Sequence, residues 1–154
     1  MEPQTLLRSI DFESQLRFDV DGRSKMFLDK NPTVLPGAIL LVEQISSRSS
    51  PQKRSFAGVY LGLRKKGVLS NIVLRTLVMG TGVEMVIPIF SPMVLKFIVL
   101  KDSNVSLEDQ KMKDINWIRE HPEKSGVDFN EIENIVIRYK NQQLRLLNDQ
   151  KKLQ

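Results

Sequence analysis

The sequence predicts a mainly β protein, a small closed antiparallel barrel with helical extensions at its N-terminal and C-terminal ends. Five short runs rich in β-branched and aromatic residues lie between residues 37 and 100, and turn-forming residues separate them. That many short strands within about 65 residues is typical of a small barrel, because closure removes exposed strand edges. The residues before and after this region follow a helical period instead.

Length and composition are those of one folded domain with extensions. The chain has 154 residues, of which 41% are hydrophobic and 27% are charged. It has no cysteine, which excludes disulfides and thiolate chemistry, and no apolar run long enough to cross a bilayer. We expect an N-terminal extension with short helices over residues 1–35, the barrel over residues 36–101, a helical C-terminal extension over residues 102–154, and no membrane partner.

The N-terminal extension has two candidate helices. In the first, one face is formed by the apolar residues Leu6, Leu7, Ile10 and Leu16. The second spans residues 23–28 and ends before Asn31-Pro32, because the residue before a proline disfavours helical backbone. Acidic residues at positions 2, 11 and 13 are unlike a transit peptide, which is poor in acids.

The five strands are expected over residues 37–45, 55–63, 70–79, 83–90 and 94–100. Pro36-Gly37 forms the turn before the first strand, and the polar, basic segment 46–54 is expected to be an exposed loop. Residues 64–67 form a hairpin tip. Gly80-Thr81-Gly82 is expected to be a tight turn in which both glycines adopt positive φ.

The second strand carries two glycines on one face. Strict alternation puts Phe56, Gly58, Tyr60 and Gly62 on that face. The opposite face then consists of Ala57, Val59, Leu61 and Leu63. Two glycines on one face predict a sharp bend of the barrel or the close approach of another backbone segment.

The C-terminal extension predicts two helices. Ser106 and Asp109 have the spacing of a capping box that begins the first helix, and Pro122 ends it. Asp128 and Glu131 offer a second cap, after which apolar and long side chains follow the helical period at positions 129, 132, 136, 139 and 143. Residues 135–137 read equally well as a strand. From residue 102 onward there are ten acidic and nine basic residues, so we expect this extension to pack on the barrel or on a protein partner.

Positive charge is concentrated in the β region. The chain has a net charge of +5 and a pI near 9.6, which indicates a polyanionic partner such as nucleic acid. Between residues 44 and 83 there is no acidic residue, and the basic residues are Arg48, Lys53, Arg54, Arg64, Lys65, Lys66 and Arg75. The remainder of the chain therefore sums to −2, since +5 minus +7 is −2. Clustering of this kind predicts a nucleic-acid-binding face on the barrel.

Nothing in the sequence predicts an enzyme, a cofactor or a metal site. The single histidine, His121, precedes a proline at a helix end, and no nucleophile or carboxylate motif points to it. A phosphate-binding glycine loop opens a helix, whereas a β-rich run follows Gly82. Glu84 is expected to pair with Arg75 or to be solvated, and a lone carboxylate forms no acid–base pair.

A distinctive pattern runs through the β region. It begins in FAGVYLGLRKKG, with Phe56, Gly58 and Val59, and continues at Ser70 and Arg75. Its most specific part is the motif Gly80, Gly82, Val83, Glu84, Val86, Pro88, Phe90, Ser91 and Pro92. With the Pro36-Gly37 turn, this pattern resembles the bacterial-type ribosomal protein nineteen of the large subunit, the L-nineteen family, over about residues 36–101.

The resemblance implies an SH3-like barrel and a structural constituent of the large ribosomal subunit that supports translation. It implies binding to large-subunit rRNA near the face that meets the small subunit, and to small-subunit rRNA at an inter-subunit bridge. By position, the implied rRNA contacts are Arg48, Lys53, Arg54, Arg64, Lys65, Lys66 and Arg75. The implied structural residues of the motif are Gly80, Gly82, Glu84, Pro88, Ser91 and Pro92.

The chain departs from bacterial members in three ways. Met93 follows Ser91-Pro92, where the family usually has a different, often basic, residue. A nearly neutral helical extension replaces a short basic C-terminus, and the whole chain is less basic. These departures favour a mitochondrial version whose C-terminal helices contact neighbouring ribosomal proteins, with the bacterial cytoplasm as the alternative location. The alternative function is an SH3-like protein-interaction module whose basic face is incidental.

Overall fold

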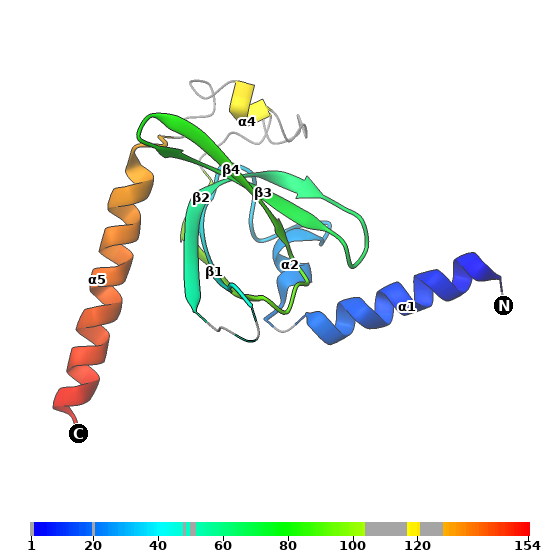
Figure 1. The fold of residues 1–154 in the computed structure, drawn as a ribbon, viewed down its shortest axis with the longest axis horizontal. Coiled ribbons are helices and arrows are strands. Elements are labelled where there is room, and N and C mark those ends of the chain that lie inside the picture. Colours follow the sequence, from blue (N-terminus) through cyan, green and yellow to red (C-terminus); the bar gives the residue numbers. More distant parts are fainter. Residues whose placement is uncertain (1, 20, 48, 50–51, 104–116, 121–127) are drawn as a thin grey trace.

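A five-stranded antiparallel sheet forms the centre of the molecule, with helices before and after it (Figure 1). The computed structural model describes residues 2–19, 21–47, 49, 52–103, 117–120 and 128–154. The strands are β1 (Ile39–Ile45), β2 (Lys53–Arg64), β3 (Asn71–Val78), β4 (Thr81–Pro88) and β5 (Val94–Lys101). The helices are α1 (Pro3–Phe18), α2 (Arg23–Phe27), α4 (Trp117–Glu120) and α5 (Glu131–Lys152). The predicted mainly β class with helical extensions is confirmed.

The sheet is open. Its strand order is β4-β3-β2-β1-β5, so the described strands β4 and β5 form the two edges and do not pair with each other. The closed barrel predicted from the sequence is therefore not confirmed. The fifth strand instead joins the sheet beside the first, where Val42 pairs with Phe97.

Strand β2 begins earlier than the sequence analysis predicted. Lys53 and Arg54 pair with Ile45 and Gln44 of β1, so the end of the expected 46–54 loop belongs to the strand. Three successive polar residues gave no alternation from which this could be recognised. The paired ends of β1 and β2 thus extend beyond the apolar part of the sheet.

A two-residue turn joins β3 to β4, one position earlier than predicted. Val78 pairs with Thr81, and the turn residues Met79 and Gly80 have φ values of 51° and 77°. Positive φ at both central positions is the geometry of the tight hairpin turns that match the twist of a sheet. The prediction of positive φ is confirmed for Gly80 and wrong for Gly82, which lies within β4.

Gly82 serves packing. A β-carbon built on it would lie 2.3 Å from the guanidinium nitrogen Nη2 of Arg75, which crosses from the neighbouring strand β3. A similar close contact explains the glycine at position 58 of β2, because a β-carbon there would lie 2.9 Å from the backbone oxygen of Arg75. The close approach predicted for a glycine of this strand is confirmed at Gly58.

A β-bulge in β2 reverses the faces of its last residues. The register between β2 and β3 shifts between Tyr60 and Gly62. An extra residue moves every later side chain to the other face. Leu63 therefore packs on the inner core with Tyr60, and the prediction that it shares the face of Val59 and Leu61 is wrong.

The inner face of the sheet is filled from all five strands and from α2. Phe27 of α2 makes edge-to-face contacts with the rings of Tyr60 and Phe97, at centroid distances of 5.5 and 5.2 Å. Burial raises the pKa of the Tyr60 phenol well above its ordinary value, so that group stays protonated. The sheet residues of this core include Leu40, Val42, Ile72, Leu74, Ile87 and Val94.

The outer face is covered by the C-terminal helices. Ile118 of α4 and Ile132 of α5 are buried against a second apolar cluster that the sheet supplies with Ile39, Val59, Leu61 and Val73. The expectation that this extension packs on the sheet is confirmed for α4 and for the first part of α5. Residues 135–137 are helical, so the alternative interpretation as a strand is wrong. The first helix predicted between Ser106 and Pro122 lies mostly outside the described residues, as does His121.

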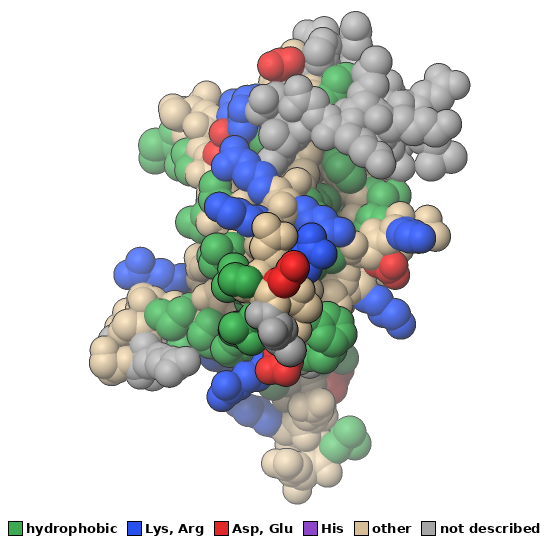
Figure 2. Space-filling view, turned by 90° about the vertical axis from the view of Figure 1, so that its right-hand side faces the viewer, with side chains coloured by type: hydrophobic (Ala, Val, Ile, Leu, Met, Phe, Trp, Pro, Cys, Tyr) green, Lys and Arg blue, Asp and Glu red, His purple; other side chains and the backbone are tan. Residues whose placement is uncertain are grey.

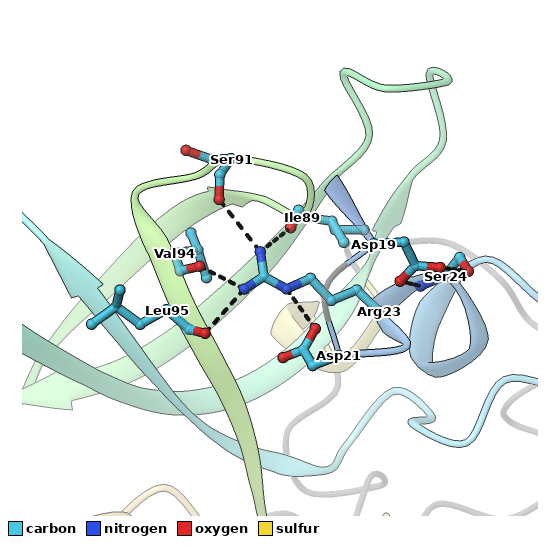
Figure 3. A network of polar contacts seen from close by, with 8 residues as sticks. All are labelled: Asp19, Asp21, Arg23, Ser24, Ile89, Ser91, Val94 and Leu95. Atoms are coloured by element: carbon cyan, nitrogen blue, oxygen red, sulfur yellow. Dashed lines mark hydrogen bonds and ion pairs between the residues drawn. The ribbon is translucent and has the colours of Figure 1, made fainter. Parts of the chain in front are cut away.

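Arg23, the first residue of α2, is buried at the junction of β4 and β5 (Figure 3). Its Nε donates to Asp21 Oδ1 at 2.7 Å. Its guanidinium carbon lies over the ring of Phe97, 5.2 Å from the ring centroid. Its two terminal nitrogens donate to four backbone oxygens, those of Ile89 (2.8 Å), Ser91 (3.4 Å), Val94 (2.5 Å) and Leu95 (3.2 Å). One side chain thus donates to four carbonyls around the connection between β4 and β5, where buried backbone oxygens need donors.

We predict that Arg23→Leu lowers the free energy of unfolding by about 3–5 kcal/mol, because it leaves buried backbone oxygens without a donor and Asp21 without its partner. Chemical denaturation of the parent and the variant measures this loss. Arg8→Leu, on the exposed surface of α1, is the control and should change stability by less than about 0.5 kcal/mol. Equal losses for both variants would contradict a structural role for Arg23.

We predict that two glycine substitutions in the β3–β4 hairpin lower the free energy of unfolding by different amounts and for different reasons. Gly80→Ala places a β-carbon at φ 77° and should cost about 1–2 kcal/mol. Gly82→Ala has no backbone strain and displaces only the flexible end of Arg75, so it should cost less than about 1 kcal/mol. Thermal unfolding compares the two. A larger loss at Gly82 would show that the turn is not where the structure places it.

Candidate nucleic-acid interface

The loop between β2 and β3, residues 64–70, is a tightly bonded tip. The Ser70 hydroxyl accepts a hydrogen bond from the Lys66 amide at 2.9 Å and donates to the Gly67 oxygen at 2.6 Å. The amides of Leu69 and Ser70 donate back to Lys66 and Gly67. Gly67 has φ 57°, which favours glycine there. This network holds the loop backbone in one conformation, so its basic side chains project from a rigid base.

Three consecutive basic side chains project from this tip. Arg64, Lys65 and Lys66 are exposed, and none of them makes an ion pair within the part of the chain that the structure describes. Figure 2 looks onto the side of the molecule from which α1 projects, and it shows Lys and Arg side chains spread over that side with several acidic ones among them. The expectation that the three residues fan outward from a turn is compatible with their exposure.

One carboxylate lies against the tip. Asp11 of α1 accepts a hydrogen bond from the Val68 amide at 2.8 Å. A β-carbon on Gly67 would collide with this carboxylate, so Gly67 also makes room for α1. Apart from this contact α1 buries none of its residues, and its apolar residues Leu6, Leu7, Ile10 and Leu16 are exposed. Phe18, the last residue of α1, packs against the inner core, so α1 is held on the sheet both at the tip and at its C-terminal end.

The predicted rRNA contacts do not form a single patch. Lys53 and Arg54 are exposed at the start of β2, whereas Arg64 ends the same strand. At about 3.3 Å per residue, the strand separates the two groups by up to about 36 Å along its path. Arg48 lies outside the described residues. The two ends of β2 thus present two separate basic sites.

Arg75 is paired within the fold. Its Nη1 lies 3.5 Å from Glu84 Oε1 on the opposite strand, and Arg119 Nε of α4 approaches the same oxygen to 2.5 Å. The prediction that Glu84 pairs with Arg75 is confirmed. Two guanidinium groups share one carboxylate here, so the cluster keeps a net charge of +1. Because Arg75 is engaged with Glu84, its predicted contact with rRNA has weaker support than the contacts of the tip.

The other motif residues shape the end of β4 and its connection to β5. Pro88 ends β4 opposite Asn71, and the Ile89 amide donates to the Ser70 oxygen at 3.1 Å. The Ser91 hydroxyl accepts from the Met93 amide at 3.2 Å, and the Ser91 oxygen accepts from Val94. Pro92 is exposed in this connection. The motif therefore joins the base of the tip to the carbonyls that Arg23 binds.

Sequence reasoning missed three residues that position this surface: Arg23, Asp11 and Arg119. Each acts on a partner distant in sequence, up to 72 residues away for Arg23 and 57 for Asp11. A charged residue on a short helix gives no local signal that it is buried or paired. The Asp21-Gly22 sequence before Arg23 indicates only a helix start.

The described residues show no group of three or more His, Cys, Asp or Glu side chains arranged to hold a metal ion. Among the described helices, none is long and apolar enough to cross a membrane.

Comparisons with known proteins agree with this arrangement of motif and fold. Residues 23–126 match the family described as Ribosomal protein L19, and the match begins at the buried arginine. The chain is 43% identical over 100 residues to the large ribosomal subunit protein bL19m of Schizosaccharomyces pombe. The matched region covers 62% of this chain and 55% of that protein. The chain is 30% identical over 67 residues to bL19 of Borreliella burgdorferi, covering 44% of this chain and 55% of that protein.

The chain thus spans about half the length of the curated relatives that it matches. The family match itself covers two thirds of the chain, including every described strand and Arg23 with the four carbonyls that it binds. On this basis the chain belongs to the ribosomal protein L19 family.

Proposed function

We propose that this protein is a structural, non-catalytic constituent of the large ribosomal subunit, which binds rRNA through the tip between β2 and β3. The observation that carries the proposal is the coincidence of the family match with three exposed cations on a rigid loop, which make no ion pair with the described residues. The relatives are named as proteins of the large ribosomal subunit. A rigid base lowers the ordering cost of phosphate binding, because less loop entropy is lost.

We propose a mitochondrial ribosome as the location. The relative from Schizosaccharomyces pombe has the name bL19m, which denotes the mitochondrial member of this bacterial-type family. The modest net charge of +5 and the C-terminal helices that bury apolar residues on the sheet accord with a member that has gained protein contacts.

The finer features of the fold and its contacts belong to the same proposal. A five-stranded meander whose last strand pairs with its first is the strand order of an SH3-like barrel, here with its edges unpaired. Lys53, Arg54 and Arg48 would form a second rRNA contact at the other end of β2, and Arg75 a minor one. Contacts with small-subunit rRNA at a bridge, and with neighbouring ribosomal proteins through α5, complete the proposed partners.

We predict that changing Arg64, Lys65 and Lys66 together to Gln flattens the salt dependence of binding to a large-subunit rRNA fragment. Each lost phosphate contact releases one fewer counterion, so the log–log slope should fall by about two to three units, at about 0.7–0.9 per contact. Affinity should fall similarly for different RNA sequences, because phosphate contacts position a protein without reading bases. Binding is measured at several salt concentrations for the parent and the variant.

The control is the triple variant Arg8→Gln, Lys25→Gln and Lys30→Gln. These residues are exposed in the N-terminal segment, and the variant removes the same amount of charge. It should leave the slope within about one unit of the parent, since only charges close to phosphates release counterions. Equal slopes for the parent and the tip variant would move the interface to the Lys53 end of β2.

We predict that the full chain co-sediments with large ribosomal subunits and remains attached in high salt, because assembly adds protein contacts and buried area that salt does not screen. Sedimentation followed by immunodetection measures the attached fraction. Complete release at a salt concentration that leaves the subunits intact would favour the alternative, a protein-interaction module with an incidental basic face.

A further inference from the structure

Helix α5 carries an apolar stripe that continues past the sheet. From residue 129 its side chains recur with alternating spacings of three and four, at Phe129, Ile132, Val136, Tyr139, Gln143, Leu146, Gln150 and Leu153. This period of 3.5 residues, sustained over more than three heptads, is the pattern of a helix that packs along another helix. Packing on the sheet alone does not require an apolar period of this length, because the sheet contacts only the first part of α5.

The sheet covers only the first part of the stripe. Ile132 is buried, and Ile135 and Val136 pack on the outer apolar cluster. From residue 141 to the end of the chain every residue is exposed. Figure 1 shows α5 continuing past the strands towards the C-terminus with no other element beside its last turns. An apolar stripe that is half covered and half exposed indicates a partner for the exposed half.

A groove of about 750 Å³ lies where α5 leaves the sheet. Its floor is the segment Ile98–Lys101 of β5, and its wall is α5 from Glu131 to Gln142. Ile135 and Tyr139, two residues on the apolar side of α5, line it. The groove and the exposed stripe are therefore one continuous surface, which begins against the sheet and follows the helix outward.

The charges beside the stripe indicate the chemistry of the occupant. Between residues 137 and 154 the basic residues are Arg138, Lys140, Arg145, Lys151 and Lys152, and the only acidic residue is Asp149. The near-neutral total of the C-terminal extension conceals this, because nine of its ten acidic residues lie between residues 102 and 133. These basic residues lie about 100–140° around the helix from the stripe, and the net charge of +4 on this segment favours acidic residues on the partner.

We propose that residues 139–153, which are α5 from Tyr139 onward and its C-cap Leu153, bind with the groove beside β5 an amphipathic helix of a neighbouring protein that carries acidic residues beside its apolar stripe. The proposal rests on the proposed function, which makes that neighbour a protein of the same ribosomal particle. Gln143 and Gln150 occupy seam positions, where polar residues select the register and the partner at a cost in stability.

The centre of this surface favours protein over RNA. Its seam holds Tyr139, Leu146 and Leu153, while the basic residues lie to its sides. Burying leucine against another helix removes apolar area from water, whereas a phosphate backbone offers no apolar surface to receive it. RNA contact by α5 is therefore an outcome that the experiment must exclude.

The test uses two leucines of α5 that differ only in face. Leu146 lies in the stripe and is 57% exposed, whereas Leu144 is 58% exposed and lies about 160° away around the helix. The chain has no cysteine, so Leu146→Cys and Leu144→Cys each create a single site for a benzophenone photo-crosslinker. Each labelled full chain is assembled into large subunits and irradiated, and the crosslinked peptide is sequenced by mass spectrometry.

The expected result is a protein crosslink from position 146 at least about tenfold stronger than from position 144, since interface contacts are concentrated at buried seam positions. The crosslinked segment should have heptad spacing and acidic flanks. A crosslink to rRNA, equal yields from both positions, or no product from position 146 in assembled particles would each overturn the proposal.

A second measurement tests the seam itself. With the crosslinker at Leu153→Cys, adding Leu146→Asp should lower the yield about tenfold, because a buried unpaired carboxylate opposes docking. Adding Leu144→Asp should leave the yield unchanged, and an equal loss from both would overturn the proposal. Co-sedimentation separates the two hypotheses: a chain that does not enter subunits overturns the proposed function, and this inference with it. A chain that enters them without the crosslink overturns this inference alone.

Discussion

The connection between β4 and β5 depends on one buried guanidinium. An open sheet leaves carbonyl groups at its edges, and buried carbonyls without donors destabilise a fold. Arg23 donates to four carbonyls around this connection with two nitrogens, and its own charge is balanced by Asp21. The same residue begins α2, so this interaction also places Phe27 on the inner core. Lysine has a single nitrogen and no planar fork, so it would not satisfy carbonyls on both sides at once.

Two apolar layers then determine what is left for binding. The inner face of the sheet is closed by α2 and the outer face by α4 and α5, so neither face remains open over its centre. The surfaces that remain include the ends of the strands, the exposed side chains of the edge strands β4 and β5, and the distal part of α5. The rigid tip between β2 and β3 lies at one such end, and its backbone is bonded to Ser70, which the motif also fixes through Ile89. Binding is thus expected on the surfaces that the two apolar layers leave exposed.

Much of the fold was predictable from sequence, and the misses have physical causes. All five strands were predicted within a few residues, because apolar runs and turn residues are local signals. Leu63 was assigned to the wrong face because a bulge depends on strand pairing, which a single strand does not reveal. Of the candidate site, the exposed tip and the Arg75–Glu84 pair followed from local sequence and motif. Arg23, Asp11 and Arg119 did not, because their partners lie far along the chain.

Ion pairing determines where the positive charge of the sheet remains available. Within the described strands, Arg75 pairs with Glu84, Lys96 with Glu43, and Lys101 with Glu131. The cations of the strands that keep no such partner are Lys53, Arg54 and Arg64, all on β2. Pairing weakens a cation's long-range field, so among the strands the two ends of β2 contribute most to the potential that attracts a polyanion, with a smaller contribution from the net +1 of Arg75, Glu84 and Arg119. The acid-free segment of the sequence therefore acts through its two ends, and the tip has the more rigid backbone of the two.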